Sequence, residues 1–269
     1  MTDIRNRNVL ITGAAMGMGR LMVDKFVAQG ARVALVDIQE EALEEAVEEL
    51  RSQGHTVEAF VCDLSERDNI VRLHEEVAER FGRIDVLVNN AALVAGGHYE
   101  DIDPKLDDAM LRVNVDAVHW MTKEFLPDLK AGRDCHIVQM ASAAGMVGVP
   151  DQAVYCASKW FVIGLAEALR QEFRDQGIKH VNISIICPSL VDTGMFDGAQ
   201  PPMLAPILEP DFVAQRVVEA VRDNELYVRE PFMVKLTPLM RSILPTKVVD
   251  VMMEKMGVTG LMKSFKGRH

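Results

Sequence analysis

Short apolar runs alternate with longer amphipathic stretches along the first two thirds of the chain. Runs rich in Val, Ile and Leu predict strands, whereas apolar residues that recur every three to four positions predict helices. The predicted strands cover residues 9–11, 32–36, 57–61, 84–88, 136–140 and 181–186. The predicted helices between them cover residues 17–29, 40–53, 66–81, 104–129 and 152–176.

This alternation predicts an α/β fold, because strands separated by helices of this length form βαβ units around a parallel sheet. Right-handed crossovers then place helices on both faces of the sheet, which makes it doubly wound. We expect a single domain over residues 1–230, with a helical C-terminal extension over residues 231–269. Residues 189–210 interrupt the alternation with four prolines, and a loop of this length predicts a lid over a binding site.

The composition excludes several classes of protein. The chain holds 40 acidic and 29 basic residues, a net charge of −11, which disfavours nucleic acid as a partner because phosphate binding needs cations. The four cysteines form no CxxC pair and no histidine cluster accompanies them, so we expect no metal site. The polar N-terminus lacks a signal-peptide pattern and no spanning apolar stretch occurs, so a cytoplasmic location is expected.

The extension differs in charge from the rest of the chain. Residues 231–269 hold seven basic and two acidic residues, a net charge of +5, which leaves −16 on residues 1–230. Apolar residues lie between these cations, a pattern compatible with weak, peripheral contact with an anionic membrane surface. The alternative, which the sequence favours, is that the apolar residues pack on the domain or on a partner subunit.

A glycine-rich turn follows the first predicted strand. Gly13, Gly17 and Gly19 stand in the spacing GxxxGxG between that strand and the first helix. Glycines let a backbone approach a pyrophosphate without a Cβ clash, and the N–H groups at the start of the helix face the anion. A tight connection alone would also use glycines. The strand, the helix and an acid after the second strand together favour a dinucleotide site in a Rossmann-type fold.

That acid is Asp37, which lies 18 residues after Gly19. A carboxylate at the end of the second strand accepts hydrogen bonds from ribose hydroxyls and repels a 2′-phosphate. Asp37 therefore favours NAD over NADP as the cofactor. The alternative is a solvated aspartate that merely ends the strand.

Tyr155 and Lys159 are four residues apart in a predicted helix, so they share one helical face. Tyrosine has a reference pKa of about 10, which is too high for a base at neutral pH. A nearby ammonium favours the phenolate, so we expect Lys159 to lower the pKa of Tyr155 and create an acid/base without histidine. A plain amphipathic pair has the same spacing.

Two further polar residues fit the same site. Ser142 follows the predicted strand 136–140 at its carboxyl end, where parallel sheets bind ligands. Its hydroxyl is placed to bind a substrate oxygen. Asn114 lies inside an apolar helical stretch, where its amide needs a partner. A structural hydrogen bond from helix to strand would also explain Asn114.

These motifs together resemble the short-chain dehydrogenases/reductases over about residues 5–230. The matching segments are TGAAMGMG (12–19), CDL (62–64), NNA (89–91), YCASK (155–159) and residues 188–193, with Asp37, Asn114 and Ser142. The resemblance implies that Tyr155 is the catalytic acid/base, assisted by Lys159. It implies that Ser142 binds the substrate oxygen and that Asn114 holds a relay water through its backbone. Ala92 and Ser189 depart from the family by replacing glycines.

The resemblance also implies a cofactor site and an oligomer. The residues that would contact NAD are Gly13, Met16, Gly17, Met18, Gly19, Asp37, Asp63, Leu64, Asn90, Ala91, Tyr155, Lys159, Pro188, Val191 and Thr193. A homodimer or homotetramer is implied, formed through the helices near 104–129 and 152–176.

The lid and the extension resemble the retinol dehydrogenases and lipid-droplet 17β-hydroxysteroid dehydrogenases, which implies a small lipophilic alcohol or carbonyl as substrate. Met146, Met195, Phe196 and Met203 are expected to line an apolar pocket, since methionine adapts to bulky apolar ligands. The reaction expected is NAD-dependent oxidation of such an alcohol, or the reverse. The alternatives are an NADPH-dependent ketoreductase and a non-catalytic NAD-binding protein of lipid surfaces.

Overall fold

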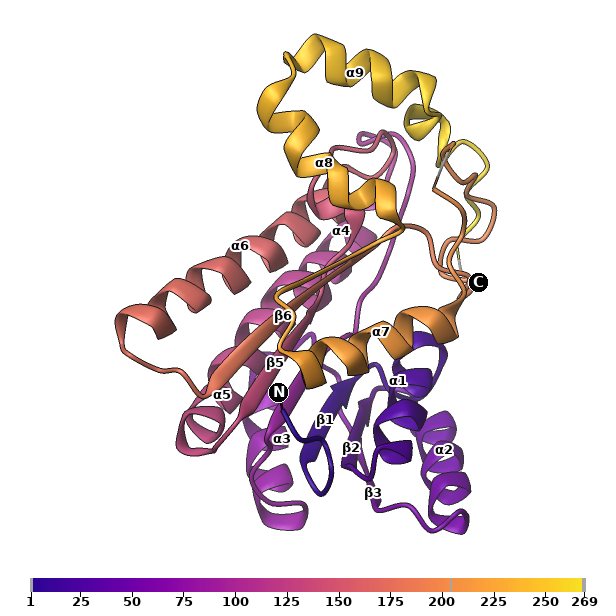
Figure 1. Cartoon of the computed structure of the whole chain (residues 1–269). Coiled ribbons are helices and arrows are strands. Elements are labelled where there is room, and N and C mark those ends of the chain that lie inside the picture. The colour runs from indigo at the N-terminus through magenta and orange to yellow at the C-terminus, as the bar shows by residue number, and fades with distance from the viewer. Residues whose placement is uncertain (1, 204, 268–269) are drawn as a thin grey trace.

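The chain folds around one parallel sheet with helices on both faces, as the alternating pattern predicts (Figure 1). A computed structural model describes residues 2–203 and 205–267. Met1, the lid residue Leu204 and the last two residues of the extension, Arg268 and His269, lie outside the described residues.

Seven strands form the sheet in the order β3-β2-β1-β4-β5-β6-β7, and every pair is parallel. The order reverses between β1 and β4, which is where open parallel sheets place their ligands. The strands are β1 (Asn8–Thr12), β2 (Arg32–Asp37), β3 (Val57–Val61), β4 (Val86–Asn89), β5 (Cys135–Met140), β6 (Val181–Pro188) and β7 (Tyr227–Glu230).

The helices connect these strands and close the molecule. They are α1 (Gly17–Ala28), α2 (Glu40–Ser52), α3 (Arg67–Arg80), α4 (Pro104–Leu111), α5 (Val118–Ala131), α6 (Ala153–Asp175), α7 (Pro210–Asp223), α8 (Phe232–Ile243) and α9 (Thr246–Lys255). Two 3-10 turns, Ala143–Gly145 and Val258–Gly260, and a π-helical segment, Arg112–Ala117, complete the described elements.

The core has two halves, one on each face of the sheet. Val9 and Ile11 of β1 pack with α1, α2 and α7, while Leu10 between them packs on the opposite side with α3, α5 and α6. Alternate residues of a strand face opposite sides, so a strand buried on both faces reads as a continuous apolar run. This explains why the run at 9–11 shows no polar position.

Two parts of the fold differ from the sequence prediction. The stretch 104–129, predicted as one helix, is divided by the π-helical segment into α4 and α5. The pattern also leaves α7 and β7 unpredicted. The edge strand β7 has only four residues, of which Val228 alone is buried, so it carries almost no apolar signal.

Candidate active site

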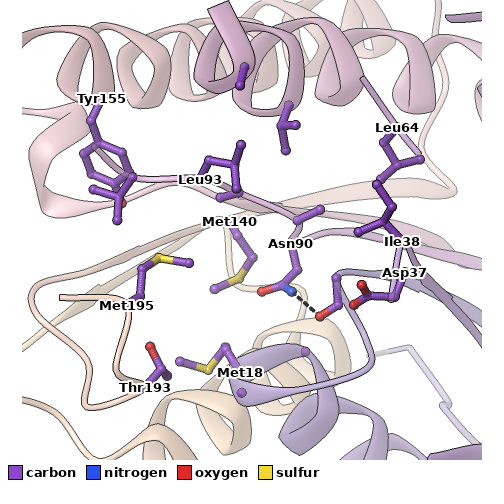
Figure 2. A pocket seen from close by; sticks show the side chains of 18 of the residues that line it. Met18, Asp37, Ile38, Leu64, Asn90, Leu93, Met140, Tyr155, Thr193 and Met195 are labelled. Carbon is purple, nitrogen blue, oxygen red and sulfur yellow. Dashed lines mark hydrogen bonds between the residues drawn. The ribbon is translucent and has the colours of Figure 1, made fainter. Parts of the chain in front are cut away.

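A cavity of about 780 Å³ lies across the carboxyl ends of the strands, at the point where the strand order reverses. Its walls come from the glycine-rich turn, the ends of β2 and β5, the loops after β3 and β4, α4, α6 and the lid. Figure 2 shows Asp37 and Leu64 at one end of this cavity and Tyr155 at the other. The site therefore has two distinct ends, one facing β2 and β3 and one facing α6.

The glycines of the turn are required by close backbone contact. A Cβ at Gly19 would lie 1.8 Å from the carbonyl oxygen of Gly13, and Gly13 itself has φ +64°, a left-handed conformation that favours glycine. Asn90 fixes the turn, because its Nδ2 donates to the carbonyl oxygens of Thr12, at 2.8 Å, and Gly13, at 3.2 Å (Figure 2). The turn thus presents bare backbone to the cavity, with Met16 and Met18 beside it.

Thr12 joins this turn to the loop after β4. Its hydroxyl accepts hydrogen bonds from the backbone N–H groups of Asn90 and Ala91, at 2.9 and 3.0 Å, and donates to the carbonyl oxygen of Val88. All four groups are thereby satisfied beneath the cavity floor. Asn90 and Ala91 both line the cavity, as the sequence predicts.

Asp37 is buried at the end of β2 and is held by two backbone donors. Its Oδ2 accepts from the N–H of Ala15, at 2.9 Å, and its Oδ1 from the N–H of Gln39, at 3.1 Å. Ile38 and Gln39, which follow it, line the same end of the cavity and carry no charge. The cations that line the cavity are Lys105, Arg112 and Lys159, which come from α4, the π-helical segment and α6.

The other predicted cofactor residues also line this cavity. Asp63 and Leu64 follow β3, and Asp63 accepts a hydrogen bond from the backbone N–H of Ser65. Pro188 ends β6, and Val191 and Thr193 follow it; Val191 forms a short bridge with Leu208 across the lid. The structure therefore brings together all fifteen residues predicted for the cofactor site.

Tyr155 and Lys159 lie one turn apart in α6, and both are buried. The Lys159 Nζ donates to the carbonyl oxygen of Met140, at 3.0 Å, and lies 5.7 Å from the centre of the Tyr155 ring. Burial lowers the pKa of Lys159 to about 8, because the ammonium loses its water, and the nearby Cys187 offsets only part of this shift. This lysine is thus held in place by the end of β5.

The sequence predicts a lowered pKa for Tyr155, and the structure contradicts this. Burial raises the pKa of Tyr155 because the phenolate loses its water, and a hydrogen bond with Ser142 opposes only part of that rise. The Lys159 ammonium faces the ring and the Met140 carbonyl, so it does not offset the loss of water. In the structure, therefore, the neutral phenol is the favoured form.

Ser142 stands directly after β5 and begins a 3-10 turn. Its hydroxyl accepts from the backbone N–H of Ala144, at 3.1 Å, and donates to the carbonyl oxygen of Pro188, at 3.5 Å. The second contact is long, so the hydroxyl is free to turn toward a ligand oxygen. Ser142 lines the cavity beside Tyr155, as predicted.

Asn114 is fully buried in the π-helical segment and does not line either cavity. Its amide pairs with the backbone of Leu93, donating to the carbonyl oxygen and accepting from the N–H, both at 2.8 Å. It also donates to the hydroxyl of Ser158, which in turn donates to the Tyr155 carbonyl oxygen. The side chain thus acts as the structural link from helix to strand loop that the sequence left open, and the relay through its backbone stays a prediction.

A second, apolar cavity of about 100 Å³ adjoins the first. Ser142, Tyr155 and Phe196 line both, and the Phe196 ring packs edge-on to Tyr155 with 5.8 Å between ring centres. The residues that sequence reasoning missed come from α8, α9 and the segment after them: Met233, Val234, Thr237, Met240, Met253, Met256, Val258 and Leu261. Their only sequence signal is the methionine-rich pattern of the extension.

The four predicted pocket residues do not all reach a cavity. Met195 and Phe196 line the larger one, and Met195 lies near Tyr155 in Figure 2. Met146 is a correction, because the chain turns after Ser142 and buries this side chain in the main core. Met203 is a second correction, because its side chain is exposed while its backbone N–H bonds to the Met256 carbonyl.

Three further findings concern metal binding, membrane spans and the cysteines. Among residues 2–203 and 205–267, no group of three or more His, Cys, Asp or Glu side chains is arranged to hold a metal ion. None of the helices in the same part of the chain combines the length and apolar character needed to cross a membrane. The four cysteines are buried thiols.

Comparison with known proteins gives a consistent result. The family model described as short chain dehydrogenase matches residues 7–203. Human epidermal retinol dehydrogenase 2 is 35% identical over 266 residues, which cover 98% of this chain and 86% of the relative. Rat estradiol 17-beta-dehydrogenase 11 is 33% identical over 251 residues, which cover 93% of this chain and 84% of the relative.

Solved structures agree. A short chain dehydrogenase/reductase from Burkholderia phymatum in complex with NAD superposes with a TM-score of 0.80 at 27% identity, covering 94% of this chain and 97% of that one. A metagenomic short-chain oxidoreductase in complex with NADP gives a TM-score of 0.71 at 31% identity, covering 84% and 97%.

Proposed function

The chain belongs to the short-chain dehydrogenase family and is an oxidoreductase related to retinol and steroid dehydrogenases, and within that class we propose that it interconverts a lipophilic alcohol and its carbonyl with NAD. One observation carries the proposal. Tyr155 and Ser142 line both the large cavity and the apolar one, so their hydroxyls stand where a cofactor and an apolar substrate would meet.

A nicotinamide dinucleotide fits the larger cavity. The backbone cradle at Gly13 and Gly19 is one that a Cβ would fill, and it stands at the start of α1, where N–H groups favour a pyrophosphate. Asp37 would hold the adenosine ribose, and Lys159 the nicotinamide ribose. When bound, the cofactor supplies hydride transfer to or from the substrate carbon.

The choice of NAD rests on the residues at the β2 end of the cavity. Asp37 already carries two backbone hydrogen bonds, which keep its carboxylate fixed, and the adjacent Ile38 and Gln39 offer no cation to a 2′-phosphate. Solved relatives are complexed with NAD in one case and NADP in another, so the family alone does not decide. A carboxylate repels a 2′-phosphate, which supports NAD and counts against the NADPH-dependent ketoreductase.

The chain's own residues would move the proton. Tyr155 would donate its hydroxyl proton to a carbonyl oxygen, or accept one from an alcohol, while Ser142 holds the same oxygen by a hydrogen bond. Because burial raises the pKa of Tyr155, the neutral phenol is ready to act as an acid in the reductive direction. In the oxidative direction Tyr155 would act as the phenolate, and Lys159 would stabilise that form only if its ammonium turned from the Met140 carbonyl toward the ring oxygen.

The apolar cavity supports a lipophilic substrate. Its lining is formed by methionine, valine, leucine and phenylalanine side chains, with Thr237, Gln152 and Ser189 as polar exceptions beside the two catalytic hydroxyls. Such a lining favours burial of a hydrocarbon body while the hydroxyls fix one oxygen. A retinol-like, steroid-like or long-chain alcohol matches this pattern better than a sugar does.

The assembly predicted from the family stays a proposal. Leu106 and Leu111 of α4 and Trp160 of α6 are exposed apolar side chains on the helices expected to form a homodimer or homotetramer. Burial of these side chains against a second copy would be favourable. The cytoplasmic location likewise stays a prediction.

A rate screen tests the proposed function. NAD⁺ and NADP⁺ are each offered with retinol, hydroxysteroids, long-chain alcohols and short alcohols, and the reduced nicotinamide is followed by absorbance. We expect turnover with NAD⁺ and an apolar alcohol. Turnover only with NADP⁺ would establish the ketoreductase alternative, and NADH binding without turnover on any alcohol or carbonyl would favour the non-catalytic one.

A further inference from the structure

The amide of Gln152 is a buried polar group that the described chain leaves without a hydrogen-bond partner. Gln152 is 3% exposed, and no acceptor among the described residues lies within hydrogen-bonding distance of its Nε2. The side chain lines the apolar cavity that Ser142 and Tyr155 also line. A buried N–H donor without a partner lowers the stability of the fold, so the presence of this amide needs an explanation.

The local backbone does not explain a glutamine at this position. Gln152 directly precedes α6, where its N–H donates to the Val149 carbonyl oxygen, at 3.3 Å, and its carbonyl oxygen accepts from the N–H of Cys156, at 2.8 Å. Its side chain forms no capping hydrogen bond, and glutamine is not among the residues that helices prefer as an N-cap. An apolar side chain of the same length would fill the space without a desolvated amide. The fold alone therefore does not account for the polar head of Gln152.

The other polar side chains of the apolar cavity differ from Gln152. The Thr237 hydroxyl donates to the carbonyl oxygen of Met233 in its own helix, at 3.5 Å. The Ser189 hydroxyl also lacks a partner among the described residues, but Ser189 lines both cavities and its single hydrogen can rotate. Gln152 lines the apolar cavity and not the larger one, so its donor belongs to the side where the substrate would lie.

The charge of the cavity limits what the amide can bind. None of the described residues that line the apolar cavity carries a charge. A carboxylate or phosphate of a ligand would be buried there without a cation, which is far less favourable than burial of a hydroxyl or carbonyl oxygen. Because an amide N–H donates to an acceptor, the ligand group that fits Gln152 is an uncharged oxygen.

We propose that the Gln152 amide binds a second, uncharged oxygen of the substrate, a proposal that rests on the proposed function. Tyr155 and Ser142 would hold the reacting oxygen, while Gln152 holds a further hydroxyl, carbonyl or ether oxygen of the same lipophilic molecule. Gln152 stands three residues before Tyr155, so the two side chains start from neighbouring points of the cavity wall. The substrate class is thus a lipophilic alcohol or ketone with two oxygens rather than one.

The opposite wall of the cavity can adapt to such a substrate. The cavity volume of about 100 Å³ lies below the range of about 300–1,000 Å³ that is typical of pockets for drug-sized ligands. Methionine side chains adjust to a ligand by rotation about three bonds. We therefore expect the wall to move while Gln152 and Tyr155, at the start of α6, stay in place. The methionines of this wall come from α8 and the end of α9: Met233, Met240, Met253 and Met256.

Binding of paired alcohols to the full chain tests the proposal. The probes are 1-decanol and a series of decanediols in which the second hydroxyl moves from carbon 3 to carbon 10. Isothermal titration calorimetry in the presence of NADH measures binding without turnover, because an alcohol and the reduced cofactor do not react. For at least one diol, the ratio of its affinity to that of 1-decanol should fall about ten-fold or more in Gln152→Met, which keeps the length of the side chain and removes the donor. Gln171→Met makes the same change at an exposed position of α6 and should leave the ratio unchanged.

The melting temperature separates ligand binding from a structural role of the amide. If the amide has no partner in the free protein, Gln152→Met should melt at the temperature of the wild type or up to about 4 °C higher. A lower melting temperature with an unchanged affinity ratio would show that the amide serves the fold, for example through a bound water, and would overturn the proposal. Failure of every decanediol to bind the wild type would overturn it as well.

Oxidation rates with NAD⁺ keep this proposal apart from the proposed function. Turnover of 1-decanol and of the diols, with an affinity ratio that does not depend on Gln152, rejects the second oxygen site and leaves the dehydrogenase in place. An affinity ratio that depends on Gln152, without turnover of any alcohol, rejects the dehydrogenase and supports the site for an oxygen at Gln152.

Discussion

Lys159 lies one helical turn after Tyr155, and its ammonium donates to the Met140 carbonyl while standing 5.7 Å from the centre of the tyrosine ring. The end of β5 therefore fixes the lysine independently of the tyrosine. This arrangement buries a cation, which lowers the free energy of unfolding. The loss depends on pH, because it applies only while Lys159 is protonated.

The charge of Lys159 should make the free energy of unfolding rise above pH 8. Burial lowers its pKa from 10.5 to about 8, so between these values the unfolded chain binds more protons than the folded one. The full penalty, about 3 kcal/mol, applies below pH 8 and disappears as the pH approaches 10.5. Urea unfolding of the wild type and of Lys159→Met from pH 7 to pH 10 measures the difference between their free energies of unfolding.

That difference should be flat below pH 8 and should then increase in favour of the wild type by up to about 3 kcal/mol. Lys179→Met, at an exposed position, controls for the loss of a positive charge. A difference that does not change with pH would show that Lys159 is charged and fully compensated in the folded chain.

Gly19→Ala should abolish dinucleotide binding. The new Cβ would meet the Gly13 carbonyl oxygen at 1.8 Å, and since this contact is with backbone the turn must open. We expect the dissociation constant for NADH, measured by fluorescence titration, to rise about 100-fold or more. Gly164→Ala in α6 is the matched control, because a Cβ there meets nothing within 4 Å.

Gly164→Ala should bind NADH as the wild type does and should stabilise the helix by about 0.5–1 kcal/mol. Equal NADH binding by the Gly19 and Gly164 variants would mean that the cradle is not the pyrophosphate site.

Asp37→Ala combined with Ile38→Arg should change the cofactor preference. The carboxylate that repels a 2′-phosphate is removed, and the exposed position 38 gains a guanidinium that pairs with one. The ratio of NADPH to NADH affinity should rise about ten-fold or more, the size expected of a charge-assisted hydrogen bond. Some stability is also lost, because the N–H groups of Ala15 and Gln39 lose their acceptor. An unchanged ratio would remove Asp37 from the cofactor site.

Much of the fold is predictable because its strands are buried on both faces. Runs such as 9–11 and 32–36 agree with β1 and β2 to within one residue at each end, since buried apolar residues bounded by polar ones leave few alternatives. The amphipathic pattern of α7 likewise predicts a helix. The π-helical segment cannot be predicted from the sequence, because it depends on the pairing of Asn114 with Leu93, two residues that only the folded loop brings together.

The sequence predicts the cofactor end of the site better than it predicts the apolar cavity. Cofactor residues follow the ends of adjacent strands, so the topology alone gathers them. The apolar cavity is built by Met233 and Met240, which lie more than 75 residues from Tyr155 in the chain. Met146 and Met203 are close in sequence to Ser142 and Phe196, but the backbone turns each of their side chains away from the apolar cavity.

The central claim is that the Tyr155 hydroxyl moves the proton, and one comparison tests it most directly. Tyr155→Phe removes that oxygen alone, while Tyr99→Phe removes the hydroxyl of a tyrosine that is 67% exposed and lines neither cavity. The value of kcat/KM for NAD⁺-dependent oxidation of an apolar alcohol should fall 10²- to 10⁴-fold, roughly the range of acid/base catalysis, in Tyr155→Phe only. NADH binding should persist in both variants. Equal rates for Tyr155→Phe and Tyr99→Phe would contradict the account.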